Sequence, residues 1–145
     1  MKRRQLYWEN VKVGQEIPCF SIAIDATRIA LQVSGSQDFY RVHHDKEFAQ
    51  AAGHRDVFVN TSFMQGCFNR LIWDWIGDEG WLRKFKMQMR RMNMPGDTIT
   101  LKGKVTKKYV TNGDHYVECD LWAENKEGVT TPAQATVILP SMSRH

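Results

Sequence analysis

The spacing of apolar residues changes from a helical to a strand-like period about half-way along the chain. In the first half, apolar residues within residues 60–76 recur at helical spacing for about four turns. Asn60 or Thr61 is suited to begin this helix, and Gly77 is suited to end it. So wide a stripe predicts a helix pressed into a sheet, with Gly66 allowing a strand or ligand to approach closely. The stripe consists of Phe63, Met64, Cys67, Phe68, Leu71, Ile72, Trp75 and Ile76.

The segments before the long helix predict one strand and two shorter helices. Residues 19–24 favour a strand, and Asp25 is suited to cap a helix over residues 26–33. Asp45 is suited to cap a second helix over residues 46–52.

After the long helix, apolar and polar residues alternate, which is typical of strands with one buried face. The first alternation slips at Arg90-Arg91, and a β-bulge would explain the slip. Helices that precede four consecutive antiparallel strands predict an α+β domain with a curved sheet around one helix. The four strands are expected within residues 81–94, 99–105, 117–123 and 133–139.

The length of 145 residues favours one domain, residues 1–145, because no repeat or linker interrupts it. No apolar run approaches a membrane span, so we expect no membrane segment. The basic start, Met1-Lys2-Arg3-Arg4, has no apolar stretch after it, so we expect no secretory signal and a cytoplasmic protein. The net charge of +4 fits an anionic ligand but does not indicate a nucleic acid partner.

The cysteines are odd in number and far apart, and each lies in an apolar pattern. Cys19, Cys67 and Cys119 therefore predict buried thiols in a reducing compartment, not disulfides. No cluster of His, Cys and Asp has the spacing of metal ligands, so we expect no metal site.

The candidate chemistry lies in residues 37–45, between two predicted helices. Asp38 precedes His43 by five positions, and an irregular loop can bring both side chains to one substrate atom. An imidazole can take a proton from water, and a carboxylate can orient it or return a proton. The alternative is a pair of solvated loop charges. His44 is expected to be structural or exposed to solvent, and Asp45 to be a helix cap.

The same loop, Gln37-Asp38-Phe39-Tyr40-Arg41-Val42-His43-His44-Asp45, resembles the Gly-Asp-x-Asn-Pro-x-His-x-Asp loop of MaoC-like dehydratases. This is the hot-dog-fold family that includes the (R)-specific enoyl-CoA hydratases. Met94-Pro95-Gly96-Asp97-Thr98 resembles the family's Pro-Gly-Asp-Thr turn, and residues 123–128 resemble its Asn-Gln-x-Gly-Glu turn. The resemblance covers about residues 8–140, and it implies a hot-dog fold.

The resemblance also implies an activity, the hydration of a trans-2-enoyl-CoA thioester or the reverse dehydration. Asp38 and His43 would be the catalytic pair that activates one water molecule. Backbone N–H groups at the start of the long helix, at Asn60 and Thr61, could hold the thioester oxygen. Coenzyme A would be part of the substrate, and no separate cofactor is expected.

The cations of the first predicted strand are candidates for the coenzyme A phosphates. A solvated strand face is the equally weighted alternative. The candidates are Arg83, Lys84, Lys86, Arg90 and Arg91. The strand lacks the exposed aromatic residues that a single-strand nucleic acid platform would need.

Three departures from the family pattern leave two functions open. Tyr40-Arg41 replaces the family's Asn-Pro, Gln37 replaces its Gly, and Asn60-Thr61 replaces its His-Gly. Some subunits of two-chain hydratases that degrade steroid side chains are similar in both places. The chain is therefore either a hydratase or dehydratase, or a non-catalytic acyl-CoA-binding subunit of a hetero-oligomeric hydratase. Hot-dog relatives pair edge to edge, so we expect a homodimer or a hetero-oligomer with another hot-dog subunit.

Overall fold

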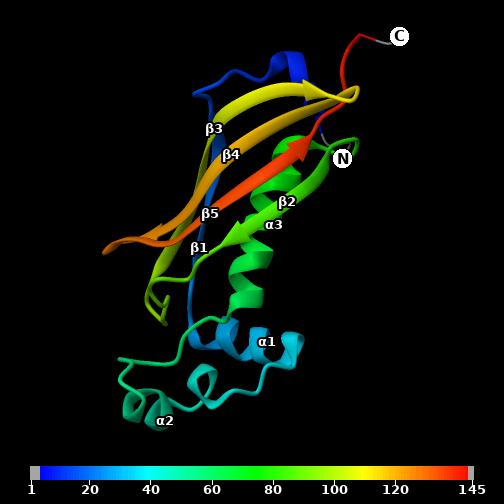
Figure 1. The fold of residues 1–145 in the computed structure, drawn as a ribbon. Helices are drawn as coiled ribbons and strands as arrows, with labels where there is room; N and C mark the ends of the chain where they lie inside the picture. Colours follow the sequence, from blue (N-terminus) through cyan, green and yellow to red (C-terminus); the bar gives the residue numbers. More distant parts are fainter. Residues whose placement is uncertain (1–3, 144–145) are drawn as a thin grey trace.

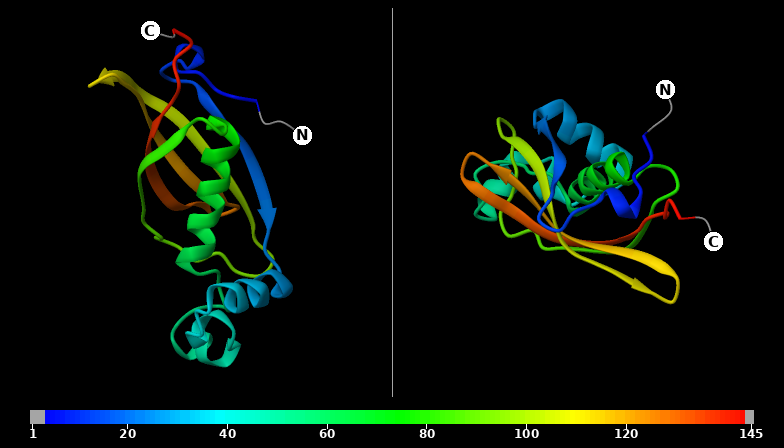
Figure 2. Two further views of the ribbon diagram at one scale, coloured as in Figure 1. Left: turned by 90° about the vertical axis from the view of Figure 1, so that its right-hand side faces the viewer. Right: turned by 90° about the horizontal axis from the view of Figure 1, so that it is seen from above.

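The computed structural model describes residues 4–143, in which one five-stranded sheet curves around a long helix (Figure 1). The strand order is β1-β3-β4-β5-β2, and every neighbouring pair is antiparallel. Helix α3 lies along the concave face, and α1 and α2 lie beyond one end of the sheet (Figure 2). This is the expected α+β hot-dog arrangement. The elements are η1 (Trp8–Asn10), β1 (Glu16–Ala23), α1 (Ala26–Ser36), η2 (Arg41–His43), α2 (Lys46–Ala51), α3 (Thr61–Ile76), β2 (Trp81–Met87), β3 (Thr98–Thr111), β4 (Asp114–Asn125) and β5 (Gly128–Ile138).

Helix α3 has the predicted bounds because both of its ends carry suitable residues. The Asn60 side chain accepts a hydrogen bond of 2.9 Å from the Phe63 N–H. Gly77 ends the helix with a φ of 79°, a left-handed value that favours glycine. Seven of the eight stripe residues are buried, and Phe63 is partly buried. The prediction of a helix pressed into a sheet is therefore confirmed.

The close approach expected at Gly66 occurs instead at Gly103, on the inner face of β3. A Cβ atom at Gly103 would lie 2.6 Å from Leu121 Cδ2 and 2.8 Å from Ile17 Cδ1. No heavy atom lies within 4 Å of the corresponding position at Gly66. The expectation for Gly66 was wrong because it lies on the exposed face of α3.

The predicted order of four consecutive antiparallel strands is wrong for its first member. Strand β2 pairs with β5, whereas β1 occupies the place beside β3. Only β3, β4 and β5 are joined by successive hairpins. A period of two shows which face of a strand is buried, but it does not show which strand lies next to it.

Strand β2 ends at Met87, earlier than the predicted segment 81–94. The next residues still follow β5, where the N–H groups of Arg90 and Arg91 both donate to the Thr130 carbonyl, at 2.9 and 3.1 Å. Two successive N–H groups opposite one residue form a bulge, so the predicted slip at this position is confirmed.

The elements before α3 were predicted with small errors in their bounds. Strand β1 begins three residues earlier than expected, and α1 continues to Ser36, where Gln37 ends it with a φ of 57°. Both predicted caps are confirmed. Asp25 accepts a hydrogen bond of 2.7 Å from the Arg28 N–H, and Asp45 accepts one of 3.0 Å from the Phe48 N–H.

The three thiols are free, but only two of them are buried. Burial raises the pKa of the Cys67 thiol to about 11 and that of the Cys119 thiol to about 12. Cys19 is exposed because it lies on the outer side of edge strand β1, which corrects the expectation of three buried thiols. Within residues 4–143, none of the helices combines the length and hydropathy that a membrane crossing requires.

Replacing Phe68 by Ala should lower the free energy of unfolding by about 3–5 kcal/mol, because it leaves a cavity between α3 and the sheet. Gln65→Ala, on the exposed face of the same helix, should change it by about 0.5 kcal/mol or less. Guanidinium unfolding of the two variants measures the difference. Equal losses would show that this face of α3 is not the core.

A disulfide reagent such as DTNB should react rapidly with one thiol of the folded protein at pH 8 and with three after denaturation. The reason is that burial shields Cys67 and Cys119 and keeps both protonated. Cys19→Ser should abolish the fast reaction. Rapid labelling of that variant would contradict the predicted burial of the other two thiols.

Candidate active site

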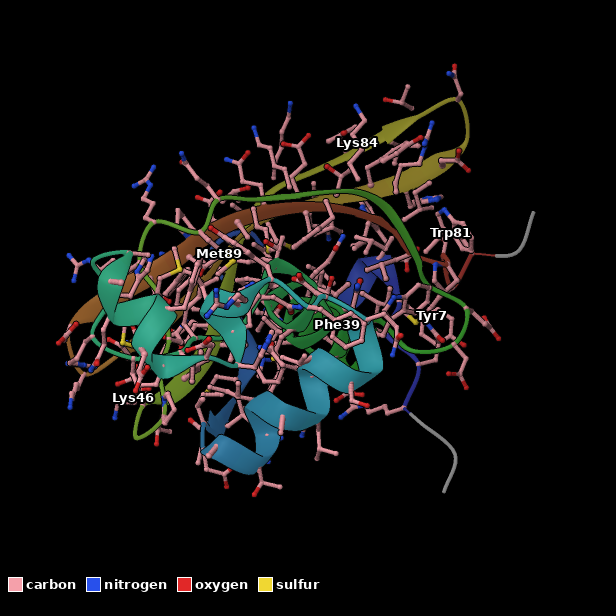
Figure 3. All side chains as sticks on the ribbon, turned by 90° about the horizontal axis from the view of Figure 1, so that it is seen from below. Tyr7, Phe39, Lys46, Trp81, Lys84 and Met89 are labelled. Carbon is pink, nitrogen blue, oxygen red and sulfur yellow. The ribbon has the colours of Figure 1, made fainter. Side chains whose placement is uncertain are left out.

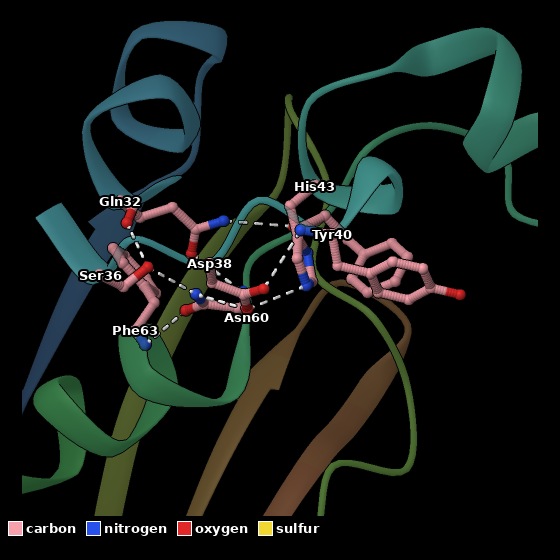
Figure 4. Close-up of polar contacts among 8 residues, drawn as sticks. Gln32, Ser36, Asp38, Tyr40, His43, Asn60 and Phe63 are labelled. Carbon is pink, nitrogen blue, oxygen red and sulfur yellow. Dashed lines mark hydrogen bonds and ion pairs between the residues drawn. The ribbon is translucent and has the colours of Figure 1, made fainter. Parts of the chain in front are cut away.

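Asp38 and His43 meet where the loop after α1 passes the start of α3 (Figure 4). His43 Nε2 lies 3.4 Å from Asp38 Oδ2. The His43 side chain is 8% exposed, whereas that of Asp38 is 39% exposed. The structure therefore brings the two predicted residues together, with the imidazole buried and the carboxylate open to solvent.

The second nitrogen of the His43 ring, Nδ1, makes the hydrogen bond that fixes the orientation of the ring. His43 Nδ1 lies 2.8 Å from the Phe58 carbonyl oxygen, which can only accept a hydrogen bond. Nδ1 must therefore carry a hydrogen, so a neutral ring has its lone pair on Nε2, toward Asp38. Phe58 and Tyr40 also pack edge-on against the ring, with centroid distances of 5.0 and 6.1 Å.

The Asp38 carboxylate is held by the start of its own loop and by the cap of α3. Oδ1 accepts a hydrogen bond of 3.3 Å from the Tyr40 N–H. Oδ2 accepts one of 3.1 Å from Asn60 Nδ2, which also donates to Ser36 Oγ at 3.0 Å. These donors hold the carboxylate in place, with Oδ2 directed at His43.

A buried glutamine, Gln32, connects the two halves of the site. Its Oε1 accepts a hydrogen bond of 2.9 Å from the Asn60 N–H, and its Nε2 donates to the Phe58 carbonyl at 3.3 Å. That carbonyl is also the partner of His43. The sequence analysis missed Gln32, although a polar residue between Ile29 and Val33 on the apolar face of α1 was a signal.

The start of α3 offers fewer free donors than its position suggests. The Asn60 N–H donates to Gln32, and the Phe63 N–H donates to the cap, so neither can hold a substrate oxygen. This corrects the expectation for the Asn60 N–H. The N–H groups of Thr61 and Ser62 have no hydrogen-bond partner among the described residues, and both residues are exposed. They point outward at the positive end of the helix dipole.

A curated relative decides the family. The 3-oxo-4,17-pregnadiene-20-carboxyl-CoA hydratase beta subunit of Mycobacterium tuberculosis is 32% identical over 94 residues, which are 65% of this chain and 73% of that protein. The MaoC-like dehydratase of Rhodospirillum rubrum has the same fold, with a TM-score of 0.82 at 18% identity over 96% of this chain and 99% of the other. The chain belongs to the MaoC-like dehydratase family.

A second solved structure supports the same assignment. The crystal structure of the ChsH1-ChsH2 complex from Mycobacterium tuberculosis matches with a TM-score of 0.79 and 27% identity. The match covers 88% of this chain and 98% of that one. No family model matches the chain.

The three arginines of this MaoC-like chain that were expected to bind phosphates do not form one cluster. Arg90 and Arg91 lie beside Thr130, and the same segment meets the start of α3 through a hydrogen bond of 3.0 Å from the Val59 N–H to the Asn93 carbonyl. Arg83 lies beside the far part of β5, because its neighbour in β2 pairs with a residue seven positions beyond Thr130. At about 3.3 Å per residue, this separates Arg83 from the other two by roughly 23 Å.

One further cation, Arg55, lies near Arg91 at the end of the sheet where α3 begins. Arg91 donates a hydrogen bond of 2.9 Å to the Glu127 carbonyl, and Arg55 lies 3.8 Å from the Glu127 carboxylate. Arg55, three residues before Phe58, is far from Arg91 in the sequence. The sequence alone therefore offered no reason to place the two side by side.

His44 and Asp45 form the end of the candidate loop. His44 is exposed, as expected. The Phe48 N–H and then the Arg41 guanidinium lower the pKa of Asp45, the cap of α2. Asp45 and Arg41 also form an ion pair of 2.6 Å.

His54 and His115 are partly buried. His54 packs on Phe58 at a centroid distance of 4.6 Å, and His115 packs on Trp8 at 5.2 Å. No group of His, Cys, Asp and Glu among residues 4–143 could hold a metal ion.

Asn60→Ala should destabilise the protein more than Asp25→Ala, although both remove a helix cap. Loss of a cap costs about 0.5–2 kcal/mol. Asn60 is 2% exposed, and its side chain also restrains Asp38 and Ser36, so its loss should lie at or above the top of that range. Urea unfolding measures both variants, and a smaller loss for Asn60→Ala would contradict its central place in the network.

Proposed function

We propose that this MaoC-like chain is an enoyl-CoA hydratase or 3-hydroxyacyl-CoA dehydratase, a lyase in which Asp38 and His43 activate one water molecule. The observation that carries the proposal is the pair of acceptors, His43 Nε2 and Asp38 Oδ2, 3.4 Å apart. A water molecule beside them can donate one hydrogen to each, which turns an oxygen lone pair toward the substrate.

Hydration then needs one proton transfer in each direction. His43 Nε2 takes a proton from the water as its oxygen bonds to Cβ of the trans-2-enoyl thioester. The electrons of the double bond move to the thioester oxygen, which becomes an enolate. Imidazolium then returns the proton to Cα, which gives the 3-hydroxyacyl-CoA. Asp38 holds the water and stabilises the imidazolium, and dehydration follows the same steps in reverse.

The enolate oxygen needs hydrogen-bond donors that have no other partner and that lie in a positive electrostatic potential. The N–H groups of Thr61 and Ser62 meet this need because they lie at the positive end of α3. Asn60 contributes by holding Asp38 in place, not by contacting the substrate.

The nucleotide end of the thioester would bind the cations near the entry to α3. Arg90 and Arg91, with Arg55 beside them, suit phosphate oxygens because guanidinium groups form charge-assisted hydrogen bonds. Arg83 lies too far along β2 to join them, and it stays a candidate for a ligand bound by a neighbouring chain.

A hetero-oligomer with another hot-dog subunit is the assembly we propose. The related hydratase chain is named a beta subunit, and one similar structure is a complex of two chains, ChsH1 and ChsH2. Phe39 and Tyr40, 62% and 60% exposed in the candidate loop, suit contact with an acyl group or with that second subunit. The alternative function is a supporting subunit that completes the active site of its partner. A single domain and a cytoplasmic location stay predictions.

His43→Ala and Asp38→Asn should each lower kcat on an enoyl-CoA by about 10²–10⁴-fold. The first removes the group that moves the proton, and the second removes the charge that holds the water and stabilises the imidazolium. The double variant should be little worse than either single variant, since the two residues act as a unit. Loss of enoyl absorbance with crotonyl-CoA and with a bulkier enoyl-CoA measures the rates.

His44→Ala is the matched control, because His44 is adjacent, exposed and without a proposed role. It should retain nearly full activity. If the purified chain is inactive alone, the same variants are assayed with a co-purified second subunit. Activity that survives His43→Ala in that complex would place the chemistry in the partner and favour the alternative function.

A further inference from the structure

The short segment of residues 58–60 carries an attachment point for each member of the candidate pair. The Phe58 carbonyl accepts the hydrogen bond of His43 Nδ1 at 2.8 Å, and Asn60 Nδ2 donates to Asp38 Oδ2 at 3.1 Å. The segment lies between α2 and α3, outside the strands of the described chain, so no strand ladder holds it. The separation of 3.4 Å between His43 and Asp38 therefore depends on what else fixes these three residues.

One side of the segment is attached to the sheet through Asn93. The Val59 N–H donates a hydrogen bond of 3.0 Å to the Asn93 carbonyl, and Asn93 is fully buried. The Asn93 side chain donates to Thr130 Oγ1 of β5 at 3.1 Å and accepts from Asn125 Nδ2 of β4 at 3.2 Å. These contacts tie the segment to the hairpin of β4 and β5.

The other side of the segment is held by the side-chain amide of Gln32. Its Oε1 accepts from the Asn60 N–H at 2.9 Å, and its Nε2 donates to the Phe58 carbonyl at 3.3 Å. In extended backbone these two groups point one way, and the N–H of Val59 points the other way. A residue of a neighbouring strand would offer the same donor and acceptor, so one side chain takes the place of a strand here.

Gln32 can reach the segment because it lies on the buried face of α1, with Ile29 and Val33. Ser36, one turn later, accepts from Asn60 Nδ2 at 3.0 Å and donates to the Gln32 carbonyl at 2.6 Å. Seen from the end of the molecule that holds the site, α1 and α2 lie in front of α3 (Figure 3). The apolar contacts of α1 place the helix, but only its polar side chains bind the backbone at residues 58–60.

We propose that Gln32 is a positioning residue, whose amide holds residues 58–60 so that His43 and Asp38 keep the separation that their chemistry needs. The inference rests on the proposed function, because it concerns the same pair. Gln32 acts through the Phe58 carbonyl and the Asn60 N–H, and it needs no contact with the substrate. A misplacement of about 1 Å can cost on the order of 10²-fold in rate, so a residue at this distance matters for turnover.

Gln32→Met tests the proposal, because Met fills a similar volume without the amide donor and acceptor. It should lower kcat on an enoyl-CoA at least about tenfold and change KM by less than about twofold, since the substrate contacts remain. Gln32→Asn keeps an amide that is one methylene too short to reach both groups, so it should recover part of the loss. The assays use the assembly in which the wild type is active, either the chain alone or its complex with a second subunit.

Ile29→Val is the matched control. Ile29 lies on the same buried face of α1, and the change lowers stability without removing a polar group. Its kcat should stay within about twofold of the wild type, also at temperatures where its loss of stability equals that of Gln32→Met.

Hydrogen exchange followed by NMR measures the same contacts without catalysis. The Asn60 amide and the hydrogen on His43 Nδ1 should exchange slowly in the wild type, because both are buried and hydrogen-bonded. In Gln32→Met both should exchange at least about tenfold faster. The Val59 amide, which Asn93 holds, should keep its rate.

Three results would overturn the proposal. One is a Gln32→Met variant with unchanged kcat. Another is an equal loss of kcat in Ile29→Val at equal stability, which would make the role of Gln32 only structural. The third is unchanged exchange of the His43 Nδ1 hydrogen in Gln32→Met, which would show that the ring does not depend on Gln32. A wild type that is inactive in every assembly would contradict the proposed function, and the exchange of His43 would then decide the positioning role by itself.

Discussion

The packing of one apolar helix face against a curved sheet fixes the position of every group in the candidate site. Met64, Phe68 and Ile76 are fully buried in that contact, and each contributes about 1.5–3 kcal/mol. The packing sets where α3 lies, and so it also sets the position of the first turn of this helix. That turn carries Asn60, the residue from which the polar network around Asp38 and His43 extends.

The network explains how a carboxylate and an imidazole are held side by side, each with its own hydrogen-bond partners. Gln32 and His43 share the Phe58 carbonyl, which fixes the hydrogen on Nδ1 and leaves Nε2 as an acceptor. Asn60 donates a hydrogen bond to Asp38 Oδ2 and so holds the carboxylate beside the ring. No buried side-chain nitrogen or oxygen of the described residues lacks a hydrogen bond, so this arrangement carries no unsatisfied polar group.

Much of the fold was predictable because its signals are local. The apolar stripe of α3, the caps at Asp25 and Asp45, and the bulge at Arg90-Arg91 depend on residues close in sequence, and all were found. Strand pairing was not predictable in the same way. The alternation in β2 is satisfied beside β3 or beside β5, and only the path of the chain across the end of the sheet decides between them.

For the site, the sequence by itself determined the chemical types, an aspartate five positions before a histidine in a loop between helices. Only the tertiary structure decided which atoms are available. The Asn60 N–H is occupied because α1 brings Gln32 against it, and Arg83 is separated from Arg90 because a strand extends its residues in one direction. Both facts depend on contacts between segments far apart in the chain, and such contacts leave no local pattern. Spacing along the sequence can therefore nominate a catalytic pair, while distances between segments decide which donors and charges surround it.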